Sequence, residues 1–349
     1  MQYKKVGRTG LKISEITLGT MIFGKQVNEA DAIKIMDLAF ERGITSFDTA
    51  DGYTGGRSEE IVGKALKNKR QAVVLATKVA SRQGSGPNDF GLSREHIMQA
   101  VEASLKRLGT DYLDIYYAHT PDYTTPIEET LRAFDNLVKQ GKVHYVACSN
   151  YRAWQLVRAL AVSEQNNIAR FDCIQSPYNL ITRDIETELL PCCTGEGVGV
   201  TVYNPLAAGL LTGKHIGDQV PASDTRFGID KIYYERYWAP VNFTAVEHLK
   251  KIADANKRNM AQFSLAWVLG NPVITSAIIG ASSTRQLEEN IGALEVKLTP
   301  EETKACDDVW LELADHRVQQ IAEFVTQIIF DAQLRHPPRF PSHVVAKIG

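Results

Sequence analysis

The chain has 349 residues, of which 44% are hydrophobic and 23% are charged, a composition typical of a globular protein rather than a disordered or fibrous one. Its formal charge of -2 lacks the basic surplus that binding to nucleic-acid phosphates requires. No segment reaches the roughly 20 apolar residues of a membrane span, and residues 1–11 do not read as a signal peptide. We therefore expect a cytoplasmic protein whose partners include neither nucleic acid nor a membrane.

The five cysteines form neither a disulfide framework nor a metal-binding pattern. No C-x-x-C pair or Cys/His zinc spacing is present in the sequence. A chain of this length buries roughly three quarters of its unfolded surface, so its core needs no disulfide or metal ion. The sequence therefore predicts no metal site, and reduced thiols that are buried or half-buried: Cys148, Cys173, Cys192, Cys193 and Cys306.

The pattern of elements begins with two short runs around a Gly-bounded turn at 7–10, which predicts a β-hairpin. From Ile16 onward, short apolar runs alternate with longer amphipathic segments about eight times. The predicted strands are 16–18, 46–48, 73–77, 113–118, 143–148, 173–176, 198–203 and 276–279. The predicted helices are 29–42, 58–66, 93–108, 127–140, 152–164, 185–196, 245–258 and 283–291.

This alternation favours parallel strands with right-handed helical crossovers. About eight such units favour a closed (β/α)8 TIM barrel over an open doubly wound sheet. The N-terminal hairpin would close the bottom of the barrel, and an extra C-terminal helix would begin at Thr299 and end at about Leu313. Since no linker interrupts the composition, we expect a single domain over residues 1–349, with a proline-containing tail at 335–349 whose role is undetermined.

Two regions carry signals for function. Residues 204–242 form a connection far longer than those elsewhere, and such long connections in compact domains are usually functional. Active sites of barrels lie at the C-terminal ends of the strands. There the second predicted strand ends at Asp48 and leads to Tyr53, the third is followed by Lys78, and the fourth by His119.

Each of these four residues has an ordinary structural explanation when it is taken alone. The aspartate could cap a helix, the tyrosine could pack against its neighbours, the lysine could be solvated, and the histidine could be a hydrogen-bonded core residue. On consecutive strands, however, they would meet at one mouth. Because an unpaired buried charge is costly, Asp48 is the expected partner of Lys78. Lys78 would lower the Tyr53 pKa from about 10, which makes this phenol a usable general acid, while His119 donates a hydrogen bond to a carbonyl oxygen. This chemistry suits the reduction of an aldehyde or ketone.

Such a reduction needs a hydride donor that amino acids do not supply. The sequence has no G-x-G-x-x-G fingerprint of a Rossmann nucleotide site. Instead, residues 278–286 place small side chains where the last predicted strand enters a helix, and a helix N-terminus there could hold a phosphate. The same residues could equally form a simple turn. Residues 208–214 are a second phosphate candidate.

Residues 47–53, Lys78 and His119 resemble the Asp, Tyr, Lys and His segments of the aldo-keto reductase superfamily, in the branch of bacterial reductases and potassium-channel β-subunits. The resemblance extends to about Leu313 and implies an NAD(P)H-binding (β/α)8 barrel. It also implies that cofactor contacts come from the loop after the first strand, from strand ends, from a belt over the pyrophosphate and from the last strand-to-helix segment: Gly19, Thr20, Met21, Asp48, Ser149, Asn150, Gln175, Tyr203, Leu206, Gly209, Lys214, Gly280, Ser282, Gln286, Glu289 and Asn290.

The sequence departs from the family at the expected 2'-phosphate site. Gly280 and Gln286 stand where many members have Lys and Arg. Arg226 and Arg285 could supply the missing positive charge, so NADPH is favoured while NADH stays open.

Three hypotheses for function follow. The first is an NAD(P)H-dependent reductase of an aldehyde or ketone, which would also oxidise the alcohol. The second is a redox-sensing, cofactor-binding subunit of the channel β-subunit type, and the third is a barrel enzyme that uses no nucleotide. Substrate contacts are expected from Phe23, Tyr53, His119 and Trp238, which suit a sugar or an aromatic carbonyl. The substrate and the oligomeric state are left open.

Overall fold

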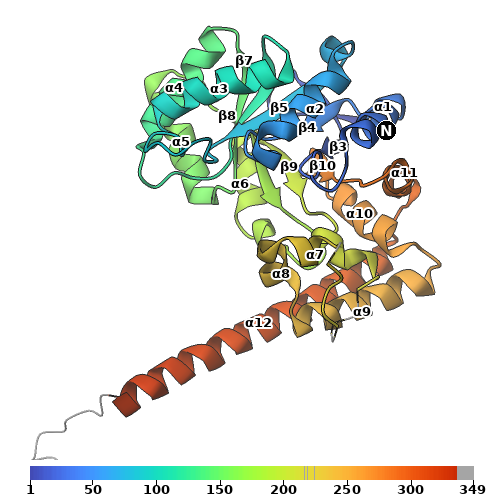
Figure 1. The fold of residues 1–349 in the computed structure, drawn as a ribbon. Helices are drawn as coiled ribbons and strands as arrows, with labels where there is room; N and C mark the ends of the chain where they lie inside the picture. Colours follow the sequence, from blue (N-terminus) through green and yellow to red (C-terminus); the bar gives the residue numbers. More distant parts are fainter. Residues whose placement is uncertain (216, 218, 224, 336–349) are drawn as a thin grey trace, which may run out of the picture.

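The computed structural model describes residues 1–335 except 216, 218 and 224, with side chains up to residue 317. Parallel strands form a closed barrel in the order β10-β3-β4-β5-β6-β7-β8-β9, surrounded by helices (Figure 1). The (β/α)8 TIM barrel prediction is therefore confirmed. The strands are β3 (Ile16–Gly19), β4 (Ser46–Asp48), β5 (Val74–Val79), β6 (Leu113–Ala118), β7 (Val143–Ser149), β8 (Phe171–Pro177), β9 (Gly199–Tyr203) and β10 (Ser276–Ile279).

The N-terminal hairpin closes one end of the barrel, as predicted. Strands β1 (Tyr3–Lys5) and β2 (Lys12–Ser14) pair antiparallel, and the fully buried Val6 packs with inward-facing residues of the barrel such as Tyr117. Gly7 has a φ of +53°, and a Cβ there would lie 2.3 Å from the carbonyl oxygen of Gly197. Only glycine therefore allows the hairpin to approach the start of β9 this closely.

Helices cover the outside of the barrel, and most of them are amphipathic, as the alternation in the sequence predicts. Several begin at side-chain caps; for example, the Ser93 side chain accepts a hydrogen bond from the His96 backbone N–H at 3.3 Å. The covering helices are α1 (Glu29–Glu41), α2 (Arg57–Leu66), α3 (Arg94–Leu108), α4 (Ile127–Lys139), α5 (Ala153–Asn166), α6 (Leu189–Glu196), α9 (Pro240–Ala255), α10 (Met260–Gly270) and α11 (Thr284–Ile291).

One helix was not predicted, and two predicted helices begin at other residues than expected. The sequence pattern missed α10 because most of its residues are buried and apolar, so it lacks the polar face that makes a helix recognisable. Helix α9 begins at Pro240 rather than 245, with proline in its first turn. Helix α6 begins at Leu189 rather than 185, because Pro191 fits only within the first turn of a helix.

The C-terminal helix is longer than predicted. Helix α12 (Pro300–Arg335) does not end at about Leu313, because neither Gly nor Pro interrupts the sequence from 301 until Pro337. Its first part packs along α9, and its second part projects away from the barrel (Figure 1). Residues 336–349 of the predicted tail lie outside the described residues.

The long connection after β9 folds into short helices, α7 (Arg226–Ile229) and α8 (Lys231–Tyr237), which precede α9.

As predicted, the cysteines are buried, except Cys192, which is half-buried, and all five are free thiols. Along residues 1–335, no helix combines the length and the apolar content needed to cross a membrane.

Candidate active site

The barrel brings the four predicted catalytic residues together at the C-terminal ends of adjacent strands. Asp48 ends β4, Lys78 lies near the end of β5, and His119 directly follows β6. Tyr53 begins a short 3-10 turn (Tyr53–Gly56) after the β4 loop. The rings of Tyr53 and His119 meet edge to face, with centroids 5.8 Å apart.

Lys78 is the centre of this group and is fully buried. Its Nζ donates hydrogen bonds to Asp48 Oδ1 at 2.5 Å, to the carbonyl oxygen of Thr49 at 2.8 Å and to the hydroxyl oxygen of Tyr53 at 3.3 Å. All three donors of the ammonium group therefore have partners, which is the condition for keeping a charge in the protein interior. The predicted Asp48–Lys78 pair is present, and it holds the Lys78 ammonium group beside the Tyr53 hydroxyl.

The protonation states favour a neutral phenol and a neutral imidazole. Burial raises the pKa of Tyr53, and the neighbouring Lys78 only partly opposes this rise. The prediction that Lys78 lowers the Tyr53 pKa below its usual value is therefore wrong. Burial lowers the pKa of His119 to about 3, with Lys78 adding to the effect. Burial alone would also lower the pKa of Lys78, but Asp48 and Tyr53 reverse this and hold it above its usual value. Tyr53 thus retains a proton that it can donate.

A second layer of amides surrounds the four residues. Gln175 Nε2 in β8 donates to Asp48 Oδ2 at 2.9 Å, so the carboxylate is held on both oxygens. Asn150 Nδ2 donates to the carbonyl oxygen of His119 at 2.9 Å, and Asn150 Oδ1 accepts from the Tyr203 hydroxyl at 2.8 Å. Asn150 and Gln175, two of the residues that the family resemblance assigns to the cofactor, are therefore hydrogen-bonded to the catalytic candidates or to their main chain.

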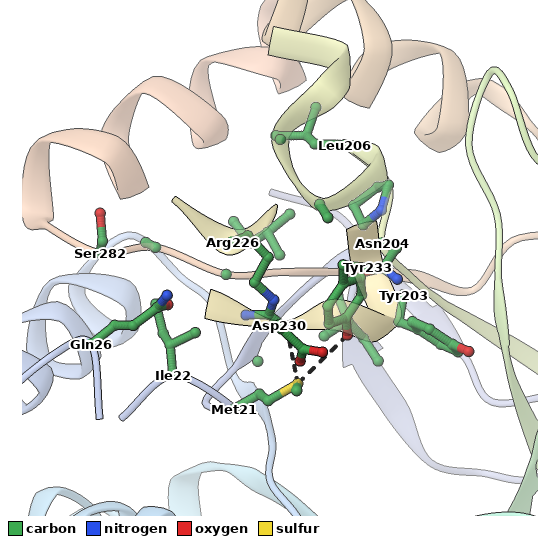
Figure 2. A pocket seen from close by; sticks show the side chains of 18 of the residues that line it. Met21, Ile22, Gln26, Tyr203, Asn204, Leu206, Arg226, Asp230, Tyr233 and Ser282 are labelled. Atoms are coloured by element: carbon green, nitrogen blue, oxygen red, sulfur yellow. Dashed lines mark hydrogen bonds between the residues drawn. The ribbon is translucent and has the colours of Figure 1, made fainter. Parts of the chain in front are cut away.

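One pocket of about 580 Å³ is lined by Asp48, Tyr53 and His119, with Lys78 buried behind them, and extends to the N-terminus of α11. Figure 2 shows side chains of the β3–α1 loop, of the segment after β9 and of Ser282 around it. The predicted residues that line it are Gly19, Thr20, Met21, Asp48, Tyr53, His119, Ser149, Asn150, Gln175, Tyr203, Leu206, Gly209, Lys214, Arg226, Gly280, Ser282 and Gln286.

The far end of the pocket fits an anionic group of a dinucleotide. The backbone N–H and hydroxyl of Ser282 both donate to Gln286 Oε1, at 2.7 and 2.9 Å, so donors at the start of α11 already face an acceptor oxygen. Lys214 and Arg226 add positive charge to the lining. The buried amide nitrogen of Asn204, also in the lining, has no hydrogen-bond partner among the described residues. These donors suit phosphate and ribose oxygens.

Five predicted contacts lie outside the lining of this pocket. The prediction for Phe23 is wrong: the loop curls back through a hydrogen bond from Phe23 N to the Thr20 carbonyl oxygen at 2.9 Å, and the ring is fully buried in the core. The prediction for Trp238 is also wrong, because its ring packs against Phe227, with centroids 4.9 Å apart, instead of facing the pocket. The remaining three lie on α11, where Arg285 Nε pairs with Glu289 at 3.0 Å and Asn290 Nδ2 donates to the Gly280 carbonyl oxygen.

The structure adds pocket residues that the sequence analysis did not select. The Tyr233 hydroxyl and Arg226 Nη2 both reach Met21 Sδ, at 3.7 and 3.0 Å, and so bridge the mouth between the β3–α1 loop and the segment after β9 (Figure 2). The Arg226 guanidinium also stacks on the Tyr233 ring at 4.3 Å. Aromatic residues at 233–238 were the available signal, but Trp238 was selected instead of Tyr233. Other lining residues are Ile22, Gln26, Asn204, Pro205, His215, Thr225, Asp230, Ile232 and Arg236, together with Ala208 and Thr212 of the segment 208–214 and Ile278, Ile279 and Ala281 of the segment 278–286, the two segments expected to hold phosphate.

Comparison with known proteins agrees with this geometry. The aldo/keto reductase family model matches residues 15–311. A probable voltage-gated potassium channel subunit beta of Arabidopsis thaliana is 39% identical over 309 residues, covering 86% of this chain and 94% of the relative. The uncharacterized oxidoreductase YrpG of Bacillus subtilis is 39% identical, covering 89% and 96%. A versiconal hemiacetal acetate reductase of Aspergillus parasiticus is 33% identical, covering 90% and 99%. By its barrel, its Asp–Tyr–Lys–His group and this match, the chain belongs to the aldo/keto reductase family.

Proposed function

We propose that this protein is an NAD(P)H-dependent reductase that converts an aldehyde or ketone to the alcohol and also catalyses the reverse oxidation. The observation that carries the proposal is the contact of the Tyr53 hydroxyl with Lys78 Nζ at 3.3 Å, at the mouth of a pocket that His119 also lines. A proton donor, a fixed cation and a second hydrogen-bond donor meet where a carbonyl oxygen could lie.

The chain's own residues supply the proton and hold the substrate. When bound, a reduced nicotinamide supplies a hydride to the carbonyl carbon. Tyr53 donates its phenolic proton to the carbonyl oxygen, which completes the alcohol. Lys78 stabilises the phenolate that this transfer leaves, and Asp48 and the Thr49 carbonyl oxygen keep Lys78 in place. His119, neutral at working pH, donates a hydrogen bond that orients the carbonyl oxygen.

We further propose that NADPH is the preferred cofactor and that NADH binds less tightly. Lys214, Arg226 and Arg236 are cations of the pocket lining, and Lys214 and Arg226, with Ser282 at the start of α11, are the groups we assign to phosphate binding. Tyr203, at the end of β9, offers a ring for the nicotinamide to stack on. Together with Tyr53 and Tyr233, it gives the mouth an aromatic wall that suits a sugar or an aromatic carbonyl.

The test combines binding and turnover in one preparation. Fluorescence titration with NADPH and NADH measures the two affinities, and loss of nicotinamide absorbance with a panel of aldehydes and ketones measures reduction. We expect turnover in the wild type, and in Tyr53→Phe a loss of about 100-fold or more in kcat with nucleotide affinity retained. An undiminished rate in Tyr53→Phe would contradict the proposal.

A second candidate function is a cofactor-binding subunit of the potassium-channel type. It is favoured by relatives named as probable or putative channel beta subunits in Arabidopsis thaliana, rice and fission yeast. Tight nucleotide binding without turnover of any carbonyl in the panel would support it. Absence of binding by either nucleotide would contradict both functions.

A further inference from the structure

A buried carboxyl group lies two residues before Tyr53, in the loop 49–52 that joins it to Asp48. Asp51 is fully buried, and neither of its carboxyl oxygens accepts a hydrogen bond of good geometry from the residues that the structure describes. An ionised carboxylate in such a place is costly, since water no longer solvates it. Asp51 takes no part in the proposed proton transfer, so its burial calls for another explanation.

The charges around Asp51 favour its neutral form. Glu59 of α2 is also fully buried, and it is already bound by the Thr77 hydroxyl and by Arg107 Nε of α3, both at 2.6 Å. Arg107 is therefore paired with Glu59 and only partly compensates a second negative charge. Burial and then Glu59 raise the pKa of Asp51 to about 7, with Arg107 opposing them.

The remaining groups around Asp51 supply no further charge. The Ser81 hydroxyl and the Gly52 N–H lie near its carboxyl group and offset part of the rise in pKa that burial causes. Tyr116 of β6 faces the same space, and its buried hydroxyl also lacks a hydrogen-bond partner. His96 of α3 lies beside the main chain of Ser81, and burial lowers its pKa. Among the described residues around Asp51, Glu59 and Arg107 therefore form a balanced ion pair, and Asp51 is an acid without a cation of its own.

The main chain of the loop connects Asp51 to the catalytic candidates. The Asp51 N–H donates to the Lys78 carbonyl oxygen at 3.2 Å, and Lys78 Nζ donates to the Thr49 carbonyl oxygen at 2.8 Å. The Tyr53 N–H in turn donates to the Ala50 carbonyl oxygen at 3.1 Å. A shift of Asp51 toward solvent would therefore move Tyr53 relative to Lys78.

We propose that Asp51 is a positioning residue: its neutral carboxyl group keeps the loop 49–52 against β5, and its ionisation displaces Tyr53 from Lys78. Ionisation places a second negative charge beside the buried Glu59, and moving the loop outward relieves this repulsion. Carbonyl reduction therefore declines as the pH rises through neutrality. This inference rests on the proposed function, in which Tyr53 is the proton donor.

The experiment compares pH profiles of kcat and kcat/KM for reduction, from about pH 5.5 to about pH 9, in the wild type, Asp51→Asn and Asp172→Asn. Asn has the shape of a neutral acid but does not ionise. Asp172 is the matched control, because burial raises its pKa to about 6 but it lies on β8. We expect the wild type and Asp172→Asn to lose about tenfold in kcat within one pH unit above the transition, and Asp51→Asn to keep its rate there.

An unchanged decline in Asp51→Asn, or its disappearance in Asp172→Asn as well, overturns the inference. Infrared spectroscopy of the cofactor-free Asp172→Asn protein gives a second readout that needs neither turnover nor the Asp51 variant. The carbonyl band of a protonated carboxylic acid should be present at about pH 6 and absent at about pH 8.5. If this carbonyl band is absent at the lower pH, the inference is overturned. If the band is present but the protein reduces no carbonyl compound of the panel, only the proposed function is contradicted.

Discussion

Replacing Lys78 by Met should destabilise the fold more than any surface change, because it leaves a buried charge without its partner. The Lys78 side chain is 0% exposed and the Asp48 side chain 5% exposed. Without Lys78, Asp48 keeps only the hydrogen bond from Gln175 Nε2. Removing one member of a buried pair costs about 3–5 kcal/mol. Met has nearly the length of Lys, so loss of packing adds little to this figure.

The double variant Asp48→Asn/Lys78→Met separates charge from packing. It removes both charges and leaves a neutral amide at position 48 that can accept or donate, so we expect it to recover most of the loss, to within about 1–2 kcal/mol of the wild type. Urea unfolding, with the midpoint compared at constant slope, measures each free energy of unfolding. Lys34→Met is the matched control, because Lys34 pairs with Asp31 at the surface and should show no measurable change.

Two outcomes would refute this reasoning. A cost below about 1 kcal/mol for Lys78→Met would mean that water or another cation compensates Asp48. A double variant as unstable as Lys78→Met would mean that packing, and not the uncompensated carboxylate, determines the loss.

Three further predictions concern other parts of the molecule. Arg226→Gln should weaken NADPH binding about tenfold more than NADH binding in fluorescence titration, because a charged hydrogen bond to the extra phosphate is lost; equal weakening would contradict this. The pKa of Asp51 is about 7 in the folded protein, above its ordinary value of 3.8. The protonated Asp51 therefore contributes fully to the free energy of unfolding below about pH 4, and about 4 kcal/mol of this contribution is lost as the pH rises to about 7. Asp51→Asn should remove that part of the pH dependence in urea unfolding, and an identical dependence in both proteins would contradict it. Gly7→Ala should cost about 2 kcal/mol or more in the same assay, because the new Cβ collides with Gly197, and a change under about 0.5 kcal/mol would exclude that collision.

The sequence was sufficient for the elements that alternate clearly. Strand β6 is bounded by polar residues and has the predicted limits 113–118. The uniformly apolar α10 could not be recognised by periodicity, and the end of α12 could not be placed without a breaker residue. A helix is recognised by periodicity only when one side is buried and the other exposed, whereas the fully buried β6 is recognised as a short apolar run between polar residues.

For the site, the sequence predicted the residue types and the strand ends but not the directions of the loop side chains. Met21 and Phe23 follow the same strand, yet a tight turn directs the Met21 sulfur to the pocket and the Phe23 ring to the core. The bond between Gln175 and Asp48 joins residues 127 positions apart, and no local signal predicts it. The Tyr53 pKa depends on a balance between burial and Lys78 that only the folded environment determines.

The two ends of the pocket are built differently, and this difference bears on function. At the catalytic end, the cation Lys78 is 0% exposed and held by fixed acceptors, so the charge needs no rearrangement when a proton leaves Tyr53. At the far end, the Gln286 side chain occupies the donors of Ser282, and Arg226 is bound to Met21 rather than to an acid. A phosphate would have to displace these neutral partners, which costs less than breaking an ion pair. If the proposed function holds, the site combines a fixed Lys78 beside the proton donor Tyr53 with side chains that would exchange partners when a nucleotide binds.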